Sequence, residues 1–175
     1  MNERARILLF TGDGKGKTTA ALGMALRACG HGMRVAVVQF VKSQENTGEL
    51  LASVGPGSLE IVQTGLGWVP DREDPEFARH RQAARNGLRR AAEYIASGLY
   101  DLIVLDEVCY AVSAGLLADG TVREVVEKAP PEMVVTLTGR GATERLIELA
   151  DTVTEMRCVK HGLKQGRRAQ KGVEL

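Results

Sequence analysis

The stretch that organises the chain is Ile7-Leu8-Leu9-Phe10-Thr11-Gly12-Asp13-Gly14-Lys15-Gly16-Lys17-Thr18-Thr19. It runs from an apolar strand through a glycine-rich turn directly into a helix, which is the construction of a phosphate-binding loop. In such a loop the backbone N–H groups and the positive end of the helix surround an oligophosphate. The ammonium of Lys17 can reach the bridging oxygens, and the Thr18 hydroxyl can ligate Mg²⁺.

The spacing of this loop departs from the usual pattern G-x-x-x-x-G-K-[ST] by one residue. That pattern would place its first glycine at position 11, where the chain has Thr11, and Gly12 follows one residue later. Glycines before a helix can also form a tight turn that binds nothing. The strand before the turn and the helical run 20–26 after it favour nucleotide phosphates, because they supply the context that the motif requires. The residues expected to bind the nucleotide are Gly12, Asp13, Gly14, Lys15, Gly16, Lys17, Thr18 and Thr19.

Apolar strands alternate with helical segments along the rest of the chain. We expect strands at 6–11, 34–41, 59–63, 100–107, 132–138 and 152–159, and helices at 17–30, 74–98, 122–128 and 143–150, with a short helical turn at 49–52. The first two strands are nearly continuous apolar runs, so they are expected to be covered on both faces. A strand–helix–strand order implies right-handed crossovers and a parallel sheet. The sequence therefore predicts an α/β fold.

Composition limits the function classes. The 175 residues are 44% hydrophobic with no linker-like stretch, which predicts a single domain spanning 1–175. Because 23 basic residues are balanced by 22 acidic ones, the net charge gives no overall electrostatic attraction to nucleic acid or to an anionic membrane. The three cysteines form no C-x-x-C pair, and no apolar run approaches the ~18 residues of a membrane span. We expect a cytoplasmic protein.

Two carboxylates end the apolar run that begins at Tyr100. Asp106 and Glu107 follow Leu105 directly, at the carboxyl end of the expected strand. In a phosphate-loop protein this is where a second metal-positioning element lies, with Asp106 holding Mg²⁺ directly or through water and Glu107 beside the reacting end. Alternatively, these acidic residues only finish the strand and cap the next helix.

Basic residues occur in three further places. Arg140 lies between two glycines after an expected strand, where it can pair with phosphate oxygens or form a surface salt bridge. Arginines recur along the helix 74–98, and the near-neutral total charge favours a solvated face over a nucleic-acid stripe. The basic segment 160–168 is either a disordered tail or a lid near the phosphates, and the residues leave both possibilities open.

Several motifs together resemble the phosphate-loop class of ATP:corrinoid adenosyltransferases, over essentially the whole chain. They are Gly12 to Thr19, Val38-Gln39-Phe40 with Lys42, Gly48-Glu49, Leu105-Asp106-Glu107, Thr138-Gly139-Arg140-Gly141, Ala150 to Arg157, Val159-Lys160-His161 and Gln170 to Glu174. The resemblance implies a RecA-type P-loop fold and a reaction in which the cobalt(I) of a reduced corrinoid attacks the ribose 5′-carbon of ATP and triphosphate leaves. It also implies Mg²⁺, a nucleotide lying in the reverse sense along the loop, a homodimer and an electron-donating flavoprotein.

The same resemblance points to a corrinoid-facing stretch. Relatives carry G-F-T-W there, with an aromatic pair that helps to exclude the lower axial ligand of cobalt, and this chain has Gly65-Leu66-Gly67-Trp68. Trp68 matches, whereas Leu66 offers less apolar area than a phenylalanine. The residues expected to act in the reaction are therefore Lys17, Trp68 and Leu66. Without the resemblance, Trp68 reads as an ordinary packing residue beneath a loop.

Two other functions remain open at the level of the sequence. A small-molecule kinase or ATPase needs only the phosphate loop and Asp106-Glu107. A non-catalytic ATP-binding module, or a RecA-like fragment that touches single-stranded DNA, is a further class. Single-strand binding calls for a basic groove that carries aromatic side chains, and an aromatic content of 4% argues against it.

Overall fold

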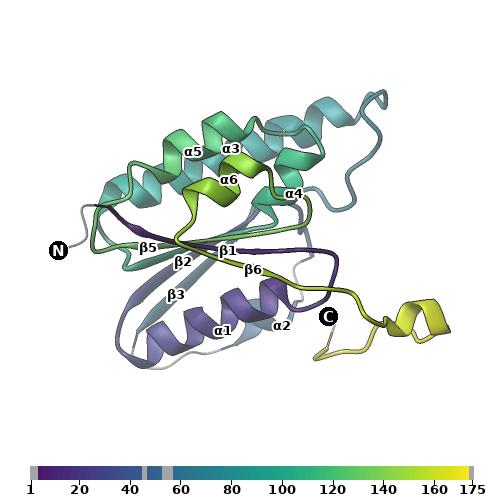
Figure 1. Ribbon diagram of the computed structural model, residues 1–175, viewed down its shortest axis with the longest axis horizontal. Helices are drawn as coiled ribbons and strands as arrows, with labels where there is room; N and C mark the ends of the chain where they lie inside the picture. Colours follow the sequence, from purple (N-terminus) through teal and green to yellow (C-terminus); the bar gives the residue numbers. More distant parts are fainter. Residues whose placement is uncertain (1–3, 45–46, 53–56, 174–175) are drawn as a thin grey trace.

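The computed structural model describes residues 4–44, 47–52 and 57–173. Its centre is a six-stranded sheet in the order β3-β2-β4-β5-β1-β6 (Figure 1). The strands are β1 (Arg6–Thr11), β2 (Arg34–Gln39), β3 (Ser58–Gln63), β4 (Leu102–Asp106), β5 (Val134–Thr138) and β6 (Thr152–Glu155). All neighbouring strands pair in parallel. The expected parallel α/β fold is confirmed.

Helices cover both faces of this sheet. One face carries α1 (Lys17–Gly30) and the short α2 (Gly48–Leu51) (Figure 1). The other face carries α3 (Phe77–Ser97), α4 (Val108–Ser113), α5 (Asp119–Val126) and α6 (Glu144–Leu149). A 3₁₀ turn, Gly162–Gln165, follows the last strand. None of the helices within the described residues is both long enough and apolar enough to span a membrane.

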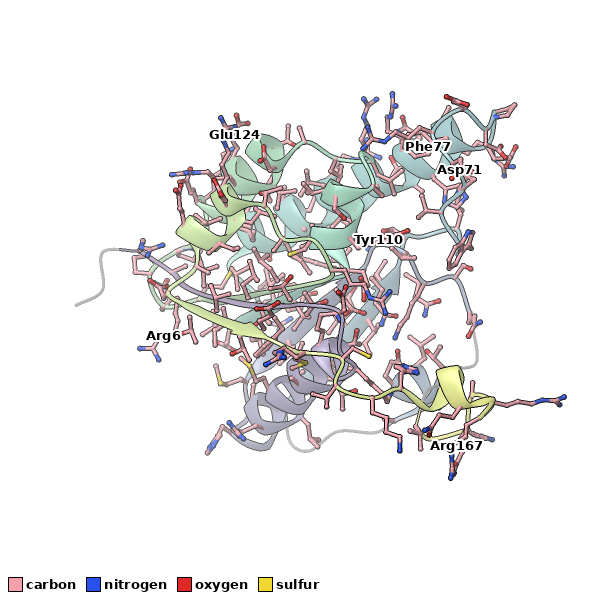
Figure 2. The ribbon with its side chains drawn as sticks, turned by 45° about the vertical axis from the view of Figure 1, so that its right-hand side comes forward. Arg6, Asp71, Phe77, Tyr110, Glu124 and Arg167 are labelled. Carbon is pink, nitrogen blue, oxygen red and sulfur yellow. The ribbon has the colours of Figure 1, made fainter. Side chains whose placement is uncertain are left out.

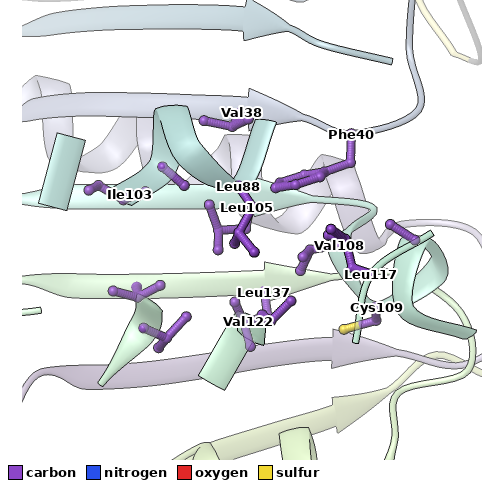
Figure 3. Packing of buried hydrophobic residues seen from close by; sticks show 14 of the residues in the cluster. Val38, Phe40, Leu88, Ile103, Leu105, Val108, Cys109, Leu117, Val122 and Leu137 are labelled. Carbon is purple, nitrogen blue, oxygen red and sulfur yellow. The ribbon is translucent and has the colours of Figure 1, made fainter. Parts of the chain in front are cut away.

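Apolar side chains fill the space on each side of the sheet. The larger cluster joins Ile103, Leu105 and Leu137 of the sheet to Leu88 of α3 and Val122 of α5 (Figure 3). The smaller cluster packs α1 against the opposite face through small residues such as its alanines. Burying each large aliphatic side chain contributes about 1.5–3 kcal/mol relative to exposure. The core therefore fixes where each strand ends, and the carboxyl ends of parallel strands lie at one edge of the sheet, where ligands bind.

Two local expectations were wrong, and one helix was missed. The helix expected from Asp74 begins at Phe77, because Asp74 forms a turn in which its carboxylate accepts the Glu76 N–H at 2.7 Å. The last strand ends at Glu155 rather than at Val159, because the Met156 carbonyl turns to accept the Gly14 N–H at 2.6 Å. The helix α4 was not expected at all.

Candidate functional site

The conformation of the glycine-rich loop between β1 and α1 restricts which residues can occupy it. Gly12 and Gly16 adopt φ values of 90° and 119°, in the region that favours glycine. A Cβ on Gly12 or Gly14 would lie 2.5 or 2.6 Å from the carbonyl oxygen of Met156. Glycine is thus required at both positions by the backbone that packs against the loop.

Lys17 lies inside the curve of this loop. Its side chain is nearly buried, with 6% of the residue exposed, and Nζ donates to the carbonyl oxygens of Gly12 and Gly14, each at 2.7 Å. Burial lowers the pKa of the lysine, because the charged form loses hydration. These two bonds hold a cation at the floor of the site, in the position where the motif predicts a contact with phosphate oxygens.

Thr18 and Asp106 come together as the sequence predicts. The Thr18 hydroxyl donates to Asp106 Oδ1 at 2.7 Å, and the Thr138 hydroxyl donates to the same oxygen at 2.8 Å. The other carboxylate oxygen, Oδ2, accepts a bond from Gln39 Nε2 at 3.1 Å. Asp106 is therefore a buried carboxylate whose two oxygens both accept hydrogen bonds from neutral donors, and Lys42 Nζ lies 4.0 Å from Oδ2.

Glu107 is placed differently from its neighbour. Its φ of 62° is uncommon for a residue other than glycine, and its N–H donates to the Thr138 hydroxyl at 2.9 Å. Among the described residues, no side chain or backbone group forms a hydrogen bond with its carboxylate, so Glu107 occupies the N-cap position of α4 without a capping bond from its side chain. Burial, followed by the nearby charge of Asp106, raises the pKa of Glu107. Glu107 thus stands at the start of the helix, as the alternative expects, but its carboxylate makes no capping hydrogen bond.

A cavity of about 720 Å³ opens beside these groups. Its walls come from the loop 14–19, from Lys42 and Glu49, from Trp68 and Val69, and from Glu107 and Tyr110, the last of which is labelled in Figure 2. Cavities of about 300–1,000 Å³ hold drug-sized ligands. Gly12, Asp13, Leu66 and Asp106 do not border this space. Asp13 is exposed and Asp106 lies behind Thr18.

The stretch 64–68, which carries Trp68, continues the hydrogen bonding between β3 and β2 past the ends of both strands. The N–H groups of Thr64 and Gly65 donate to the Gln39 carbonyl at 3.0 and 3.3 Å, and the Gly67 N–H donates to the Val41 carbonyl at 2.8 Å. A Cβ on Gly65 would lie 2.2 Å from the carbonyl carbon of Val41, so this path also requires glycine. The loop therefore follows the end of β2 closely.

Trp68 and Leu66 are both open to solvent. Trp68 borders the cavity, yet 89% of it is exposed, and 45% of Leu66 is exposed. Exposure of this extent does not fit an ordinary packing residue beneath a loop. A large apolar side chain that borders a cavity and buries little of itself is typical of a ligand-binding surface.

Arg140 and the end of the chain complete the walls. Arg140 is exposed, borders the cavity and forms no ion pair with the described residues, so the salt-bridge alternative finds no partner there. The segment after β6 folds back over the loop, because Lys15 Nζ donates to the Val173 carbonyl at 2.6 Å. His161, Gly172 and Val173 also border the cavity. This placement favours a lid over a free tail.

A buried polar network beside the site was not assigned any role from the sequence. Gln39 Nε2 donates to Glu49 Oε1 at 3.2 Å as well as to Asp106, and Gln39 Oε1 accepts a bond from Gln63 at 2.9 Å. Lys42 Nζ forms an ion pair with Glu49 at 2.6 Å. Burial alone would raise the pKa of Glu49, but the bonds from Lys42 and Gln39 outweigh it and lower that pKa. A signal was present, since Gln39 interrupts an otherwise apolar strand.

The parallel sheet, the glycine loop and the paired Thr18 and Asp106 define an α/β protein of the P-loop type. The family profile described as ATP:corrinoid adenosyltransferase BtuR/CobO/CobP matches residues 3–175. The chain therefore belongs to the ATP:corrinoid adenosyltransferase family.

Individual relatives agree with this assignment. The chain is 39% identical over 175 residues to the corrinoid adenosyltransferase of Escherichia coli K12, covering 99% of this chain and 87% of that protein. It is 40% identical to the corrinoid adenosyltransferase CobA of Salmonella typhimurium, covering 98% and 86%. It is also 40% identical to the corrinoid adenosyltransferase of Pseudomonas aeruginosa, covering 99% and 85%. The likeness thus extends over nearly the whole length of the chain.

Proposed function

We propose that this chain transfers the 5′-deoxyadenosyl group of ATP to the cobalt(I) of a reduced corrinoid and releases triphosphate, as one domain spanning residues 1–175. Family membership over the whole chain supports this reaction. The structural observation that carries it is a single cavity of about 720 Å³ that is bordered by both the phosphate loop and Trp68. One space can thus hold a triphosphate at one end and a flat apolar molecule at the other.

The reaction places specific demands on these groups. The electron pair of cobalt(I) forms the bond to the ribose 5′-carbon, and the bond from that carbon to the triphosphate oxygen breaks with its electron pair going to the triphosphate. The protein must hold the two reactants in line and stabilise the charge on the leaving group. Residues Gly12 to Thr19 bind the phosphates in this proposal, with Gly14 to Thr19 bordering the cavity, while Lys17 and Arg140 offset the developing charge.

The donor groups at this site also fit Mg²⁺, a cation that prefers oxygen ligands and usually shares them with substrate phosphates. The Thr18 hydroxyl and the two acids supply such oxygens, although no group of three or more metal-ligating acids, cysteines or histidines occurs within the described residues. We assign direct contact to Thr18 and Glu107, because Asp106 already accepts three hydrogen bonds. When bound, the ion neutralises triphosphate charge.

A magnesium titration of ATP binding tests this assignment. Glu107→Gln should raise the Mg²⁺ concentration at half-saturation about tenfold or more, because it removes a charged ligand. Asp106→Asn should act mainly on stability, since it disturbs the bonds to Thr18, Thr138 and Gln39. If only Asp106→Asn shifts the titration, the direct ligand is Asp106.

Trp68 and Leu66 form the corrinoid side of the proposal. Their exposed apolar surfaces lie on one loop, and Trp68 borders the cavity. Packed against a macrocycle, they would exclude water from the lower face of cobalt, with Leu66 contributing less area than an aromatic ring. The proposal further includes a homodimer in the cytoplasm and an electron-donating flavoprotein that supplies cobalt(I), with no nucleic-acid or membrane partner.

Product analysis decides between this reaction and the alternative of a kinase or ATPase. The protein is incubated with Mg-ATP and a chemically reduced corrinoid, and phosphorus NMR identifies the phosphate product. Triphosphate together with a light-sensitive adenosylated corrinoid is the expected result. ADP and phosphate, formed equally without corrinoid, would overturn the proposal in favour of a kinase or ATPase.

A further inference from the structure

The buried side chain of Gln39 connects the two halves of the site. It lies at the carboxyl end of β2, with 0% of the residue exposed. Its amide nitrogen donates to Asp106 Oδ2 at 3.1 Å, and Asp106 Oδ1 in turn accepts the hydroxyl of Thr18 in the phosphate loop. A chain of two hydrogen bonds therefore leads from the phosphate loop to Gln39.

The backbone of the same residue holds the loop that carries Trp68. The Gln39 carbonyl accepts the N–H groups of Thr64 at 3.0 Å and of Gly65 at 3.3 Å. Gly65 packs so closely on Val41 that a side chain could not be added there. A displacement of the end of β2 must therefore move the loop 64–68, because the backbones at Gly65 and Val41 are in close contact.

Gln39 also fixes the orientation of its own amide. Its nitrogen is shared between Asp106 and Glu49, and its oxygen accepts the amide of Gln63 at 2.9 Å. A buried amide whose polar atoms are all hydrogen-bonded resists rotation, because turning it would leave several groups without hydrogen-bond partners. The amide thus behaves as a rigid link and not as a freely turning side chain.

We propose that Gln39 is a positioning residue that couples occupancy of the phosphate loop by Mg-ATP to the placement of Trp68 on the corrinoid side. Binding at Thr18 changes the hydrogen bond that Asp106 receives, Gln39 follows Asp106, and the loop 64–68 follows Gln39. The inference rests on the proposed function, because it concerns the same two substrates. It goes beyond that function by predicting that the two substrates bind cooperatively.

The chain itself supplies the reporter for the test, since Trp68 is its only tryptophan. Calorimetry first establishes Mg-ATP binding, and tryptophan emission is then recorded at saturating Mg-ATP without corrinoid. The wild type should show a change in emission. In Gln39→Met, which keeps the side-chain length but removes the amide, that change should fall about fivefold or more while Mg-ATP still binds.

The matched control is Gln63→Met. Gln63 lies opposite Gln39 in register on β3 and donates to its amide oxygen, but it does not contact Asp106. This control should keep most of the emission change. A response in Gln39→Met equal to that of the wild type, or an equal loss in both variants, would overturn the inference. So would a wild type that binds Mg-ATP without any change in emission.

Cooperativity gives a second and independent readout. A coupling between two sites acts equally in both directions, and typical couplings change affinity about 5–150-fold. A non-reactive corrinoid should therefore tighten Mg-ATP binding to the wild type but not to Gln39→Met. If thermal unfolding shows that Gln39→Met is not folded, Gln39→Asn is used instead. Its shorter side chain cannot place the amide within reach of both Asp106 and Glu49. Absence of Mg-ATP binding in the wild type would instead refute the proposed function.

Discussion

The two parts of the proposed site, the phosphate side with Lys17 and Asp106 and the corrinoid side with Trp68 and Leu66, are built in opposite ways. On the phosphate side, Lys17 and Asp106 are nearly buried, and each makes at least two hydrogen bonds of 2.7–3.1 Å. On the corrinoid side, Trp68 is 89% exposed and Leu66 is 45% exposed. The fold alone therefore arranges the charged groups, whereas the apolar surface becomes covered only when a ligand or another chain packs on it.

This contrast follows from the physics of each ligand. Fixed dipoles and charges stabilise a leaving group best when they already point at it. The free energy needed to orient them is therefore spent during folding and not during the reaction. An apolar surface works through burial, which occurs at the moment of binding. Substitutions on the two sides should accordingly differ in size and in the step that they affect.

The largest expected effect is that of Lys17→Ala. Removing one stabilising group at a developing charge costs about 10²–10³-fold in turnover. The lysine acts through charge and contributes little to the core, so thermal unfolding should change little. Turnover is measured with saturating Mg-ATP and reduced corrinoid. Wild-type turnover in this variant would remove Lys17 from the mechanism.

Trp68→Ala should have a smaller and more selective effect. Loss of an aromatic contact of about 0.5–1.5 kcal/mol predicts up to about a tenfold rise in the KM for corrinoid. The affinity for Mg-ATP, measured without corrinoid by calorimetry, should not change by more than about twofold if Trp68 contacts only the corrinoid. Trp68→Phe is the matched control and should retain most of the function. An equal loss of both affinities would show that Trp68 shapes the whole cavity.

Leu66→Phe should leave activity unchanged or raise it a few-fold, because an aromatic ring covers more of a macrocycle. The control is Leu99→Phe, since Leu99 is similarly exposed at 51% but lies in the turn before β4. Initial rates at low corrinoid concentration provide the comparison. A substantial loss in Leu66→Phe alone would mean that this loop packs differently from the corrinoid-facing arrangement.

The smallest effect is expected on β3 at Glu60, which does not border the cavity. Glu60 of β3 accepts hydrogen bonds from Tyr100, at 2.5 Å, and from Tyr94 of α3. These bonds lower the pKa of Glu60, so its contribution to stability is present above the unfolded value near 4.5 and is lost as the pH falls through the lower folded value. Because the group is largely exposed, the contribution is about 1 kcal/mol or less.

A pH series of thermal unfolding tests that prediction. Glu60→Gln should lower Tm by no more than about 2–4 °C at pH 7, and the difference should disappear under acidic conditions. Glu93→Gln is the control, because Glu93 is exposed and, among the residues that the structure describes, forms an ion pair only with Arg90 at 3.3 Å. A destabilisation by Glu60→Gln that persists unchanged at low pH would contradict an ionic origin.

The sequence predicts the strands well because their apolar runs leave few alternatives. The run Leu102 to Leu105 is fully buried, as expected of a central parallel strand. The proximity of Thr18 and Asp106 was also predictable, because α1 places Thr18 and β4 places Asp106 at the same edge of the sheet. The short helix α4 was not predicted, because six residues show too little helical periodicity to be distinguished from the end of a strand.

The network around Gln39 could not be predicted, for a different reason. Its partners depend on strand register, which aligns Gln39 with Asp106 of β4 on one side and with Gln63 of β3 on the other. A shift of one residue would turn each side chain to the opposite face. Similarly, the bond between Lys15 and Val173 joins residues 158 positions apart, which no local pattern reveals.

The most direct test of the central claim is a crystal structure of the protein with Mg-ATP and a non-reactive corrinoid. We predict that the three phosphates lie along residues 12–18 and that the ribose 5′-carbon faces the corrinoid beside Trp68. A nucleotide lying in the opposite sense, with its terminal phosphate directed toward the open side of the cavity and no room for a macrocycle beside Trp68, would contradict the account.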